Sequence, residues 1–234
     1  MAALLDIAGV EVRVVRKDVR NLHLSVLPPD GAVRVTAPEW MDEEAIRLFV
    51  LGKLGWIKRQ RGKMRNQERE AAREYVDRES HQVWGQRYLL QIIEQKAPPS
   101  IERRHRKLVM RVRPETDRTQ REAILYNWYR TQLRQELPKL VGHWGEVVGA
   151  MPRRIHIQRM KTKWGSCNPS NLSIRLNSEL AKKPPECLEY IILHELVHLR
   201  EPTHGPRFIA LMDRLMPQWR DRREQLRRLP VRTE

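Results

Sequence analysis

The stretch Leu193–Phe208 reads LHELVHLREPTHGPRF and contains three of the eight histidines in the chain. His194 and His198 are four residues apart and enclose Glu195, which gives the pattern HExxH. Residues four apart lie on the same face of a helix, one turn on, so both imidazoles are predicted to reach one metal ion. The carboxylate beside the first histidine is then placed to take a proton from a metal-activated water, as a general base.

A third ligand has to come from another element, because one helix cannot surround an ion. Pro202 predicts the end of the first helix, and Pro206 suits the first turn of the next. We therefore expect the chain to fold back and present His204 to the same ion. Three neutral imidazoles favour tetrahedral Zn²⁺ with an open fourth position for water.

Three alternatives to this open site remain at the level of sequence. Glu201 is a competing oxygen ligand. Cys167 or Cys187 would supply a fourth protein ligand and close the site into a structural one. The histidines could also have no metal at all. An apolar helix followed by a break and a further histidine favours the open metal site.

The periodicity around this stretch predicts an α+β fold. Residues 184–199 and 205–216 are predicted to be helices, and 154–160 and 172–177 two strands joined by a connection. A further helical pattern covers about 117–148, which Pro138 is expected to kink or divide. The first 114 residues are strand-rich with one long helix over 41–70, and the segments 10–15, 22–26 and 32–37 suggest a three-stranded meander.

No internal repeat is evident in the sequence. We expect two regions, 1–114 and 115–234, with one continuous domain as the alternative.

Four segments beyond HExxH are similar to one known family. Lys161–Cys167 (KTKWGSC) is similar to its KTRWGSC segment, with Lys163 in place of arginine, and Ile174–Asn177 is similar to the strand that follows. His204–Phe208 (HGPRF) resembles the segment of the third ligand, although Gly205 stands where a serine is usual. Met216–Trp219 (MPQW) resembles a proline–acidic–tryptophan close, with Gln218 replacing the acid.

On these segments, residues 155–219 resemble the YgjP-like family of zincin metallopeptidases, which is related to the SprT-like and WLM families. The resemblance implies a zincin-like core made of a small sheet, the HExxH metal helix and a following helix. It also implies metal-ligand roles for His194, His198 and His204, and the general-base role for Glu195. The spacing matches metzincins as well, but Glu201 stands where they place a glycine.

The segment that contains WGSC has two interpretations. In one, Lys163, Trp164 and Ser166 line the cleft beside the metal, bind substrate and offer donors to an oxyanion. In the other, Trp164 anchors the core and Gly165 makes a tight turn.

The charge of the chain widens the choice of substrate. There are 45 Lys plus Arg against 29 Asp plus Glu, a net charge of +16. Basic clusters at 58–65, 103–107 and 220–228 would suit a nucleotide or nucleic acid, or would simply be solvated surface. The leading hypothesis is a zinc-dependent hydrolase that cleaves a peptide or protein. The alternatives are a metal-dependent nucleotide pyrophosphatase or other phosphohydrolase, and a nucleic-acid-associated SprT-like protease.

The surroundings of the protein are also suggested by its sequence. Two cysteines cannot build a disulfide framework, which favours a reducing compartment. We see neither a signal peptide nor an apolar stretch of roughly 20 residues, so we expect a cytoplasmic protein with no membrane partner. Nothing in the sequence indicates the oligomeric state.

Overall fold

The computed structural model describes residues 2–27, 30–66, 69–70, 73–160, 162–228 and 231–232. The chain divides into two compact units, Met1–Ala71 with Pro230–Glu234, and Ala72–Leu229. The expected boundary after residue 114 falls inside the second unit. Strand residues such as Leu90 and Leu108 share one hydrophobic core with Leu125 and Leu133 of the helix that follows.

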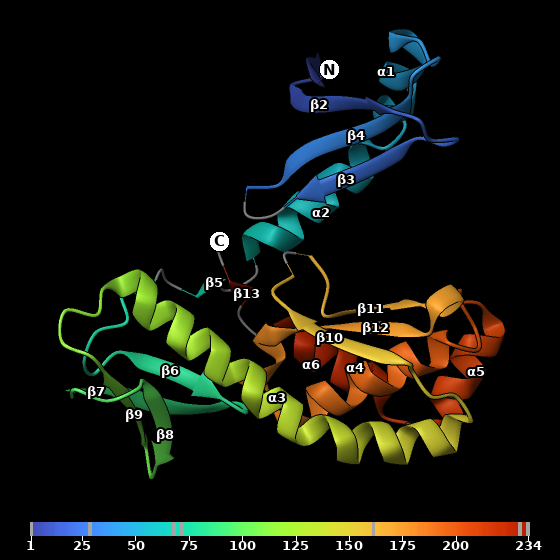
Figure 1. Ribbon diagram of the computed structural model, residues 1–234. Helices are drawn as coiled ribbons and strands as arrows, with labels where there is room; N and C mark the ends of the chain where they lie inside the picture. Colours follow the sequence, from blue (N-terminus) through green and yellow to red (C-terminus); the bar gives the residue numbers. More distant parts are fainter. Residues whose placement is uncertain are drawn as a thin grey trace. The chain divides into compact units, whose positions relative to one another are not determined.

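The first unit is a four-stranded sheet with two helices. Its strands are β1 (Ala2–Ile7), β2 (Val10–Lys17), β3 (His23–Leu27) and β4 (Ala32–Pro38), in the order β1-β2-β4-β3 (Figure 1). The predicted meander is wrong, because β2 pairs with β4 in parallel and leaves β3 at the edge. Alternate valines of β2 and β4 are buried with Ile46 and Val50 of the first helix.

The long helix expected over 41–70 is two shorter ones. They are α1 (Glu43–Leu51) and α2 (Leu54–Asn66), separated by a turn at Gly52 and Lys53. The pair of short strands β5 (Arg69–Glu70) and β13 (Val231–Arg232) also belongs to this unit.

The second unit begins with a four-stranded sheet of the same topology as the sheet of the first unit. Strands β6 (Ser80–Val83), β7 (Gln86–Glu94), β8 (Ser100–Arg104) and β9 (Lys107–Val112) lie in the order β6-β7-β9-β8, and again the central pair is parallel. Both sheets begin with a two-residue hairpin turn of positive φ, at Ala8–Gly9 and at Trp84–Gly85. The structure thus contains an internal repeat that sequence analysis missed, because many different side chains satisfy the same alternation and turn geometry.

A helix capped by aspartate follows each of these sheets, with Asp42 before α1 and Asp117 before α3 (Arg118–Val148). The latter runs through Pro138 as one helix, so Pro138 does not divide it. It buries Leu125, Leu133 and Leu137 against the second unit's core.

A three-stranded sheet and three helices complete the second unit. The strands are β10 (Arg154–Gln158), β11 (Gly165–Asn168) and β12 (Ser173–Asn177), in the order β10-β12-β11, so the connection expected between two strands contains a third. Short 3₁₀ turns lie at Pro169–Asn171 and Ser178–Lys182.

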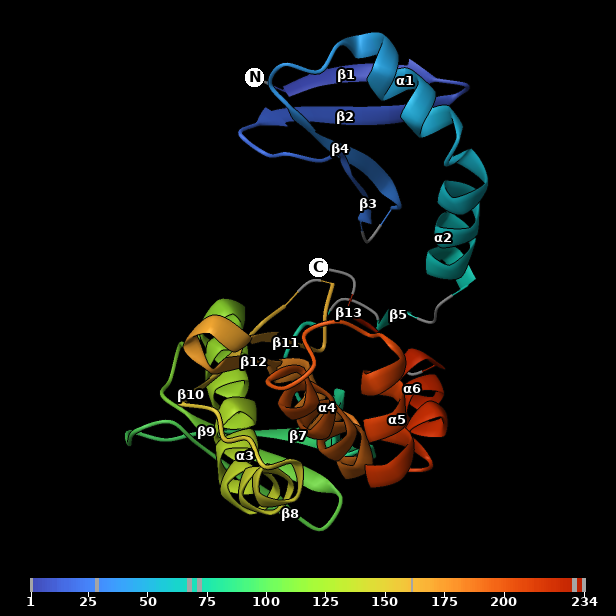
Figure 2. The ribbon, with the colours of Figure 1, turned by 90° about the vertical axis from the view of Figure 1, so that its right-hand side faces the viewer.

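The three helices are α4 (Pro185–His198), α5 (Pro206–Leu215) and α6 (Trp219–Arg228). Figure 2 shows α4 between the small sheet on one side and α5 and α6 on the other. This position explains why α4 is apolar on nearly every side and buried along most of its length. The predicted α+β class is confirmed. No helix among the described residues is long and apolar enough to cross a membrane.

Candidate active site

Three histidine nitrogens converge at the end of α4. The Nε2 atom of His204 lies 3.0 Å from Nε2 of His194 and 3.2 Å from Nε2 of His198. Nitrogens bound to Zn²⁺ at 2.0–2.1 Å in a tetrahedron are about 3.3 Å apart, close to these separations. Within the described ranges, no cysteine or carboxylate belongs to this potential ligand group. The three side chains therefore could hold one metal ion and leave a position open.

The local sequence explains how the three side chains meet. Two of them come from successive turns of α4, which ends at His198, and α5 starts again at Pro206. His204 lies in the short connection between these helices. The backbone carbonyl oxygen of Glu201 is 3.0 Å from Nδ1 of His198 and can accept a hydrogen bond from the N–H at that position. Such a bond places the proton on Nδ1 and leaves Nε2 free to bind a metal.

An aromatic ring supports the histidines from the first turn of α5. Phe208 is 1% exposed, and its ring centroid lies 4.9, 4.7 and 4.8 Å from those of His194, His198 and His204. The contact restricts the rotamers of all three imidazoles and covers one side of the site with an apolar surface.

Burial keeps His194 and His198 in the form that binds metals. It lowers the pKa of His194 to about 3, assisted by the neighbouring histidines and by the positive charge of Arg223. Burial also lowers the pKa of His198. Neutral imidazoles at physiological pH suit a metal ion, since a protonated ring nitrogen cannot bind one.

Glu195 is held between α4 and the edge of the small sheet. It is 4% exposed, and burial raises its pKa to about 7, against the opposing effect of Lys163. A Cβ atom placed on Gly165 of β11 would lie 2.5 Å from Oε1 of Glu195. Glu195 also acts with burial to raise the pKa of the Cys167 thiol to about 11.

The three residues predicted to bind substrate do not all line the cleft. Gly165 and Cys167 lie near Glu195, so alternation along β11 directs Ser166 to the opposite face. Ser166 does not line the cleft, whereas Lys163 and Trp164 do. Trp164 also packs against the hydrophobic core, with Nζ of Lys183 5.7 Å from its ring centroid. Trp164 therefore both lines the cleft and packs against the core, while Gly165 begins β11 and is not in a turn.

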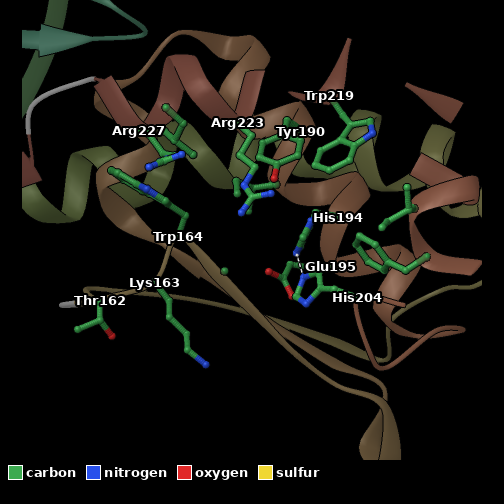
Figure 3. A pocket seen from close by; sticks show the side chains of 15 residues that line it. Thr162, Lys163, Trp164, Tyr190, His194, Glu195, His204, Trp219, Arg223 and Arg227 are labelled. Carbon is green, nitrogen blue, oxygen red and sulfur yellow. Dashed lines mark hydrogen bonds between the residues drawn. The ribbon is translucent and has the colours of Figure 1, made fainter. Parts of the chain in front are cut away.

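The cleft has a volume of about 730 Å³ and opens beside the histidines (Figure 3). The segment before β11 and its first residue, Gly165, form one wall. The rest is formed by α4, α5 and α6 and by His204 in the connection between α4 and α5. Its lining includes polar residues that sequence analysis did not place at the site, among them Tyr190 and Arg223. Tyr190 precedes His194 by one helical turn, so its position beside the site could have been predicted. Arg223 belongs to the basic cluster at 220–228, but no local spacing placed that cluster beside the histidines, because it lies on a different helix.

The α+β fold, the histidine cluster that could hold a metal ion and the buried carboxylate beside it fit a metal-dependent hydrolase of the metallopeptidase class. The chain belongs to the YgjP-like family. The model of this family, described as "YgjP-like, metallopeptidase domain", matches residues 20–229. The expected family is thus confirmed. Among curated proteins, none matches the chain.

Several solved structures are similar to part of the chain, and two of them are metallopeptidase zymogens. The metallopeptidase zymogen of Pyrococcus abyssi abylysin is 20% identical, with a TM-score of 0.37 over 41% of this chain and 99% of that one. The metallopeptidase zymogen of Methanocaldococcus jannaschii jannalysin is 23% identical, with a TM-score of 0.35 over 39% of this chain and 87% of that one.

Proposed function

We propose that the protein is a zinc-dependent metallopeptidase in which His194, His198 and His204 hold the ion and Glu195 is the general base. The observation that carries the proposal is the convergence of three Nε2 atoms beside a buried carboxylate in one cleft. Three neutral nitrogen ligands with a further position open are typical of catalytic zinc.

The chain's own groups account for the proton transfers of peptide hydrolysis. A bound Zn²⁺ supplies a Lewis acid that polarises the peptide carbonyl and makes water more acidic. The Glu195 carboxylate accepts the proton of the attacking water and then donates it to the leaving nitrogen. Close packing against Gly165 orients this carboxylate, so the base does not have to be fixed by the substrate.

The small sheet supports a peptide as the substrate. Strand β11 lies at an edge of the sheet, and its first residue, Gly165, lines the cleft. Within the part of the chain that the structure describes, β11 pairs only with β12. An extended peptide could therefore form main-chain hydrogen bonds along the free edge.

Metal analysis and kinetics test the proposal together. We expect about one zinc per chain, and weaker zinc binding after alanine replaces any of the three histidines. Glu195→Gln should retain the zinc while kcat for a peptide falls by about 10²–10⁴. Glu146→Gln makes the same chemical change at an exposed position of α3 and should leave both the zinc content and kcat unchanged. A wild-type kcat in Glu195→Gln would show that Glu195 is not the base.

We further propose a cytoplasmic location. Cys167 and Cys187 are free thiols, which fits a reducing compartment.

A further inference from the structure

Two polar groups in the cleft have no part in the proton transfers above. Tyr190 is 4% exposed, yet its hydroxyl has no hydrogen-bond partner among the described residues. Its ring is stacked on Trp219, with the centroids 6.5 Å apart and the planes at 12°. Stacking and burial therefore fix the ring and leave the hydroxyl available in the cleft that Tyr190 lines.

Arg223 lies near this hydroxyl and near the histidine site. Arg223, Tyr190 and His194 all line the same cleft. Figure 3 shows the guanidinium of Arg223 and the hydroxyl of Tyr190 on the same side of the cleft, near His194. The phenol remains protonated at physiological pH, so both groups are hydrogen-bond donors.

Among the described residues, Arg223, like Arg222, has no carboxylate partner, whereas the other three arginines of α6 each have one. Arg220 pairs with Asp213, and Arg227 and Arg228 pair with Glu224. Across the described residues, Arg223 has neither an ion pair nor a hydrogen bond through its side chain. The cleft lining contains three cationic side chains, Lys163, Arg223 and Arg227, but one carboxylate, that of Glu195.

We propose that Tyr190 and Arg223 form a subsite that binds a carboxylate of the peptide substrate, beside the bond that is cleaved. The guanidinium fork can donate two parallel hydrogen bonds to a carboxylate, and the phenol can donate one more. The carboxylate comes from an aspartate or glutamate side chain or from the C-terminus of the peptide. This inference rests on the proposed peptidase function and specifies its substrate class.

Matched peptides test the subsite. In one series, the two peptides of a pair differ only in having glutamate or glutamine at one position near the cleaved bond. In the other series, they differ only in having a free or an amidated C-terminus. For the wild type we expect kcat/KM to be about 10–100-fold higher for the acidic member of a pair, as expected for a charged hydrogen-bonded contact. The series in which the preference appears identifies the source of the carboxylate.

Two variants and a matched control assign the preference to residues. Arg223→Gln should reduce the acidic-to-neutral ratio to about 1, and Tyr190→Phe should reduce it several-fold without disturbing the stack on Trp219. Arg228→Gln removes the same charge from the same helix outside the cleft lining and should keep the wild-type rate and ratio.

Three results would overturn the subsite. They are equal cleavage of acidic and neutral peptides by the wild type, an unchanged ratio in Arg223→Gln, and equal losses of kcat for both peptides in the two variants. The last would mean that the pair acts on the reacting oxygen. A nucleotide substrate is a further outcome. If Arg223→Gln lost hydrolysis of a nucleoside triphosphate but cleaved peptides as the wild type does, the result would also contradict a peptide subsite.

Binding separates this inference from the proposed function. Zinc-loaded Glu195→Gln should bind the acidic peptide more tightly than its neutral match by fluorescence anisotropy, and Arg223→Gln added to it should abolish the difference. A wild type that cleaves no peptide would contradict the peptidase function, while equal binding of the two peptides would contradict the subsite.

Discussion

Gly165 leaves the space that the carboxylate of Glu195 occupies. A Cβ atom at position 165 would lie 2.5 Å from Oε1, 2.8 Å from Cγ and 2.9 Å from Cδ of Glu195. Real Cβ atoms do not approach other heavy atoms so closely, so any side chain at this position has to displace the glutamate or the strand. Strand β11 and helix α4 therefore determine together where the proposed base lies.

Gly165→Ala is expected to impair catalysis while zinc stays bound. The added methyl group displaces the Glu195 carboxylate, and a misplacement of about 1 Å can lower kcat by about 10²-fold. The measurements are kcat for a peptide, zinc content and melting temperature.

Gly142→Ala is the matched control for this variant. Its Cβ would meet nothing within 4 Å, and it lies inside helix α3. It should keep the wild-type kcat and stabilise the protein by up to about 1 kcal/mol. If Gly165→Ala were as active as Gly142→Ala, the close packing would have no role in positioning Glu195.

Phe208→Leu is expected to weaken zinc binding by about tenfold or more, because the ring contacts all three histidines. Affinity is measured by competition with a chelator at neutral pH. Met212→Leu changes another fully buried side chain of the same helix with little change of volume, and it should leave the affinity unchanged. Equal affinities in the two variants would rule out a supporting role for Phe208.

The stability of the second unit is expected to fall in mild acid because of His81. This side chain is 3% exposed, and its Nε2 lies 3.0 Å from Oε2 of Glu79. Burial lowers its pKa to about 4; Glu79 opposes this effect, while Arg73 and Lys182 add to it. Between pH 6.5 and 4 the unfolded chain binds a proton that the folded chain does not, so the free energy of unfolding decreases as the pH falls.

Urea unfolding at pH 7 and pH 4.5 measures this effect. The loss of stability should be smaller in His81→Asn than in the wild type, by on the order of 2 kcal/mol. Comparing the two proteins cancels the acid sensitivity of the other histidines. Equal losses in both would mean that His81 takes up its proton as readily in the folded protein as in the unfolded chain.

The parts of the protein that could be predicted are those governed by local spacing. The helix around His194, the break near Pro202 and the restart at Pro206 are local features, and each is present in the structure. The same spacing indicated that His204 would approach the other two histidines. Strand positions such as 10–15 and 32–37 were also predictable, because alternation depends on neighbouring residues alone.

Strand order and unit boundaries were not predictable in this way. The parallel pairs β2–β4 and β7–β9 join strands separated by another strand, and alternation does not specify which strand is the neighbour. The two sheets share a topology with little similarity in sequence, so their repeat became visible only in the strand order. The strands β6 to β9 belong with the site because their core side chains pack with α3 and α4.

The sequence by itself therefore determined which residues could form a metal site, since HExxH and the third histidine lie within eleven residues of chain, 194–204. Only the tertiary structure decided what surrounds that site. Gly165 comes from 30 residues before Glu195, and Arg223 from 29 residues after His194. Contacts over such separations depend on how sheets and helices pack, and packing is set by burial of the whole core rather than by local spacing.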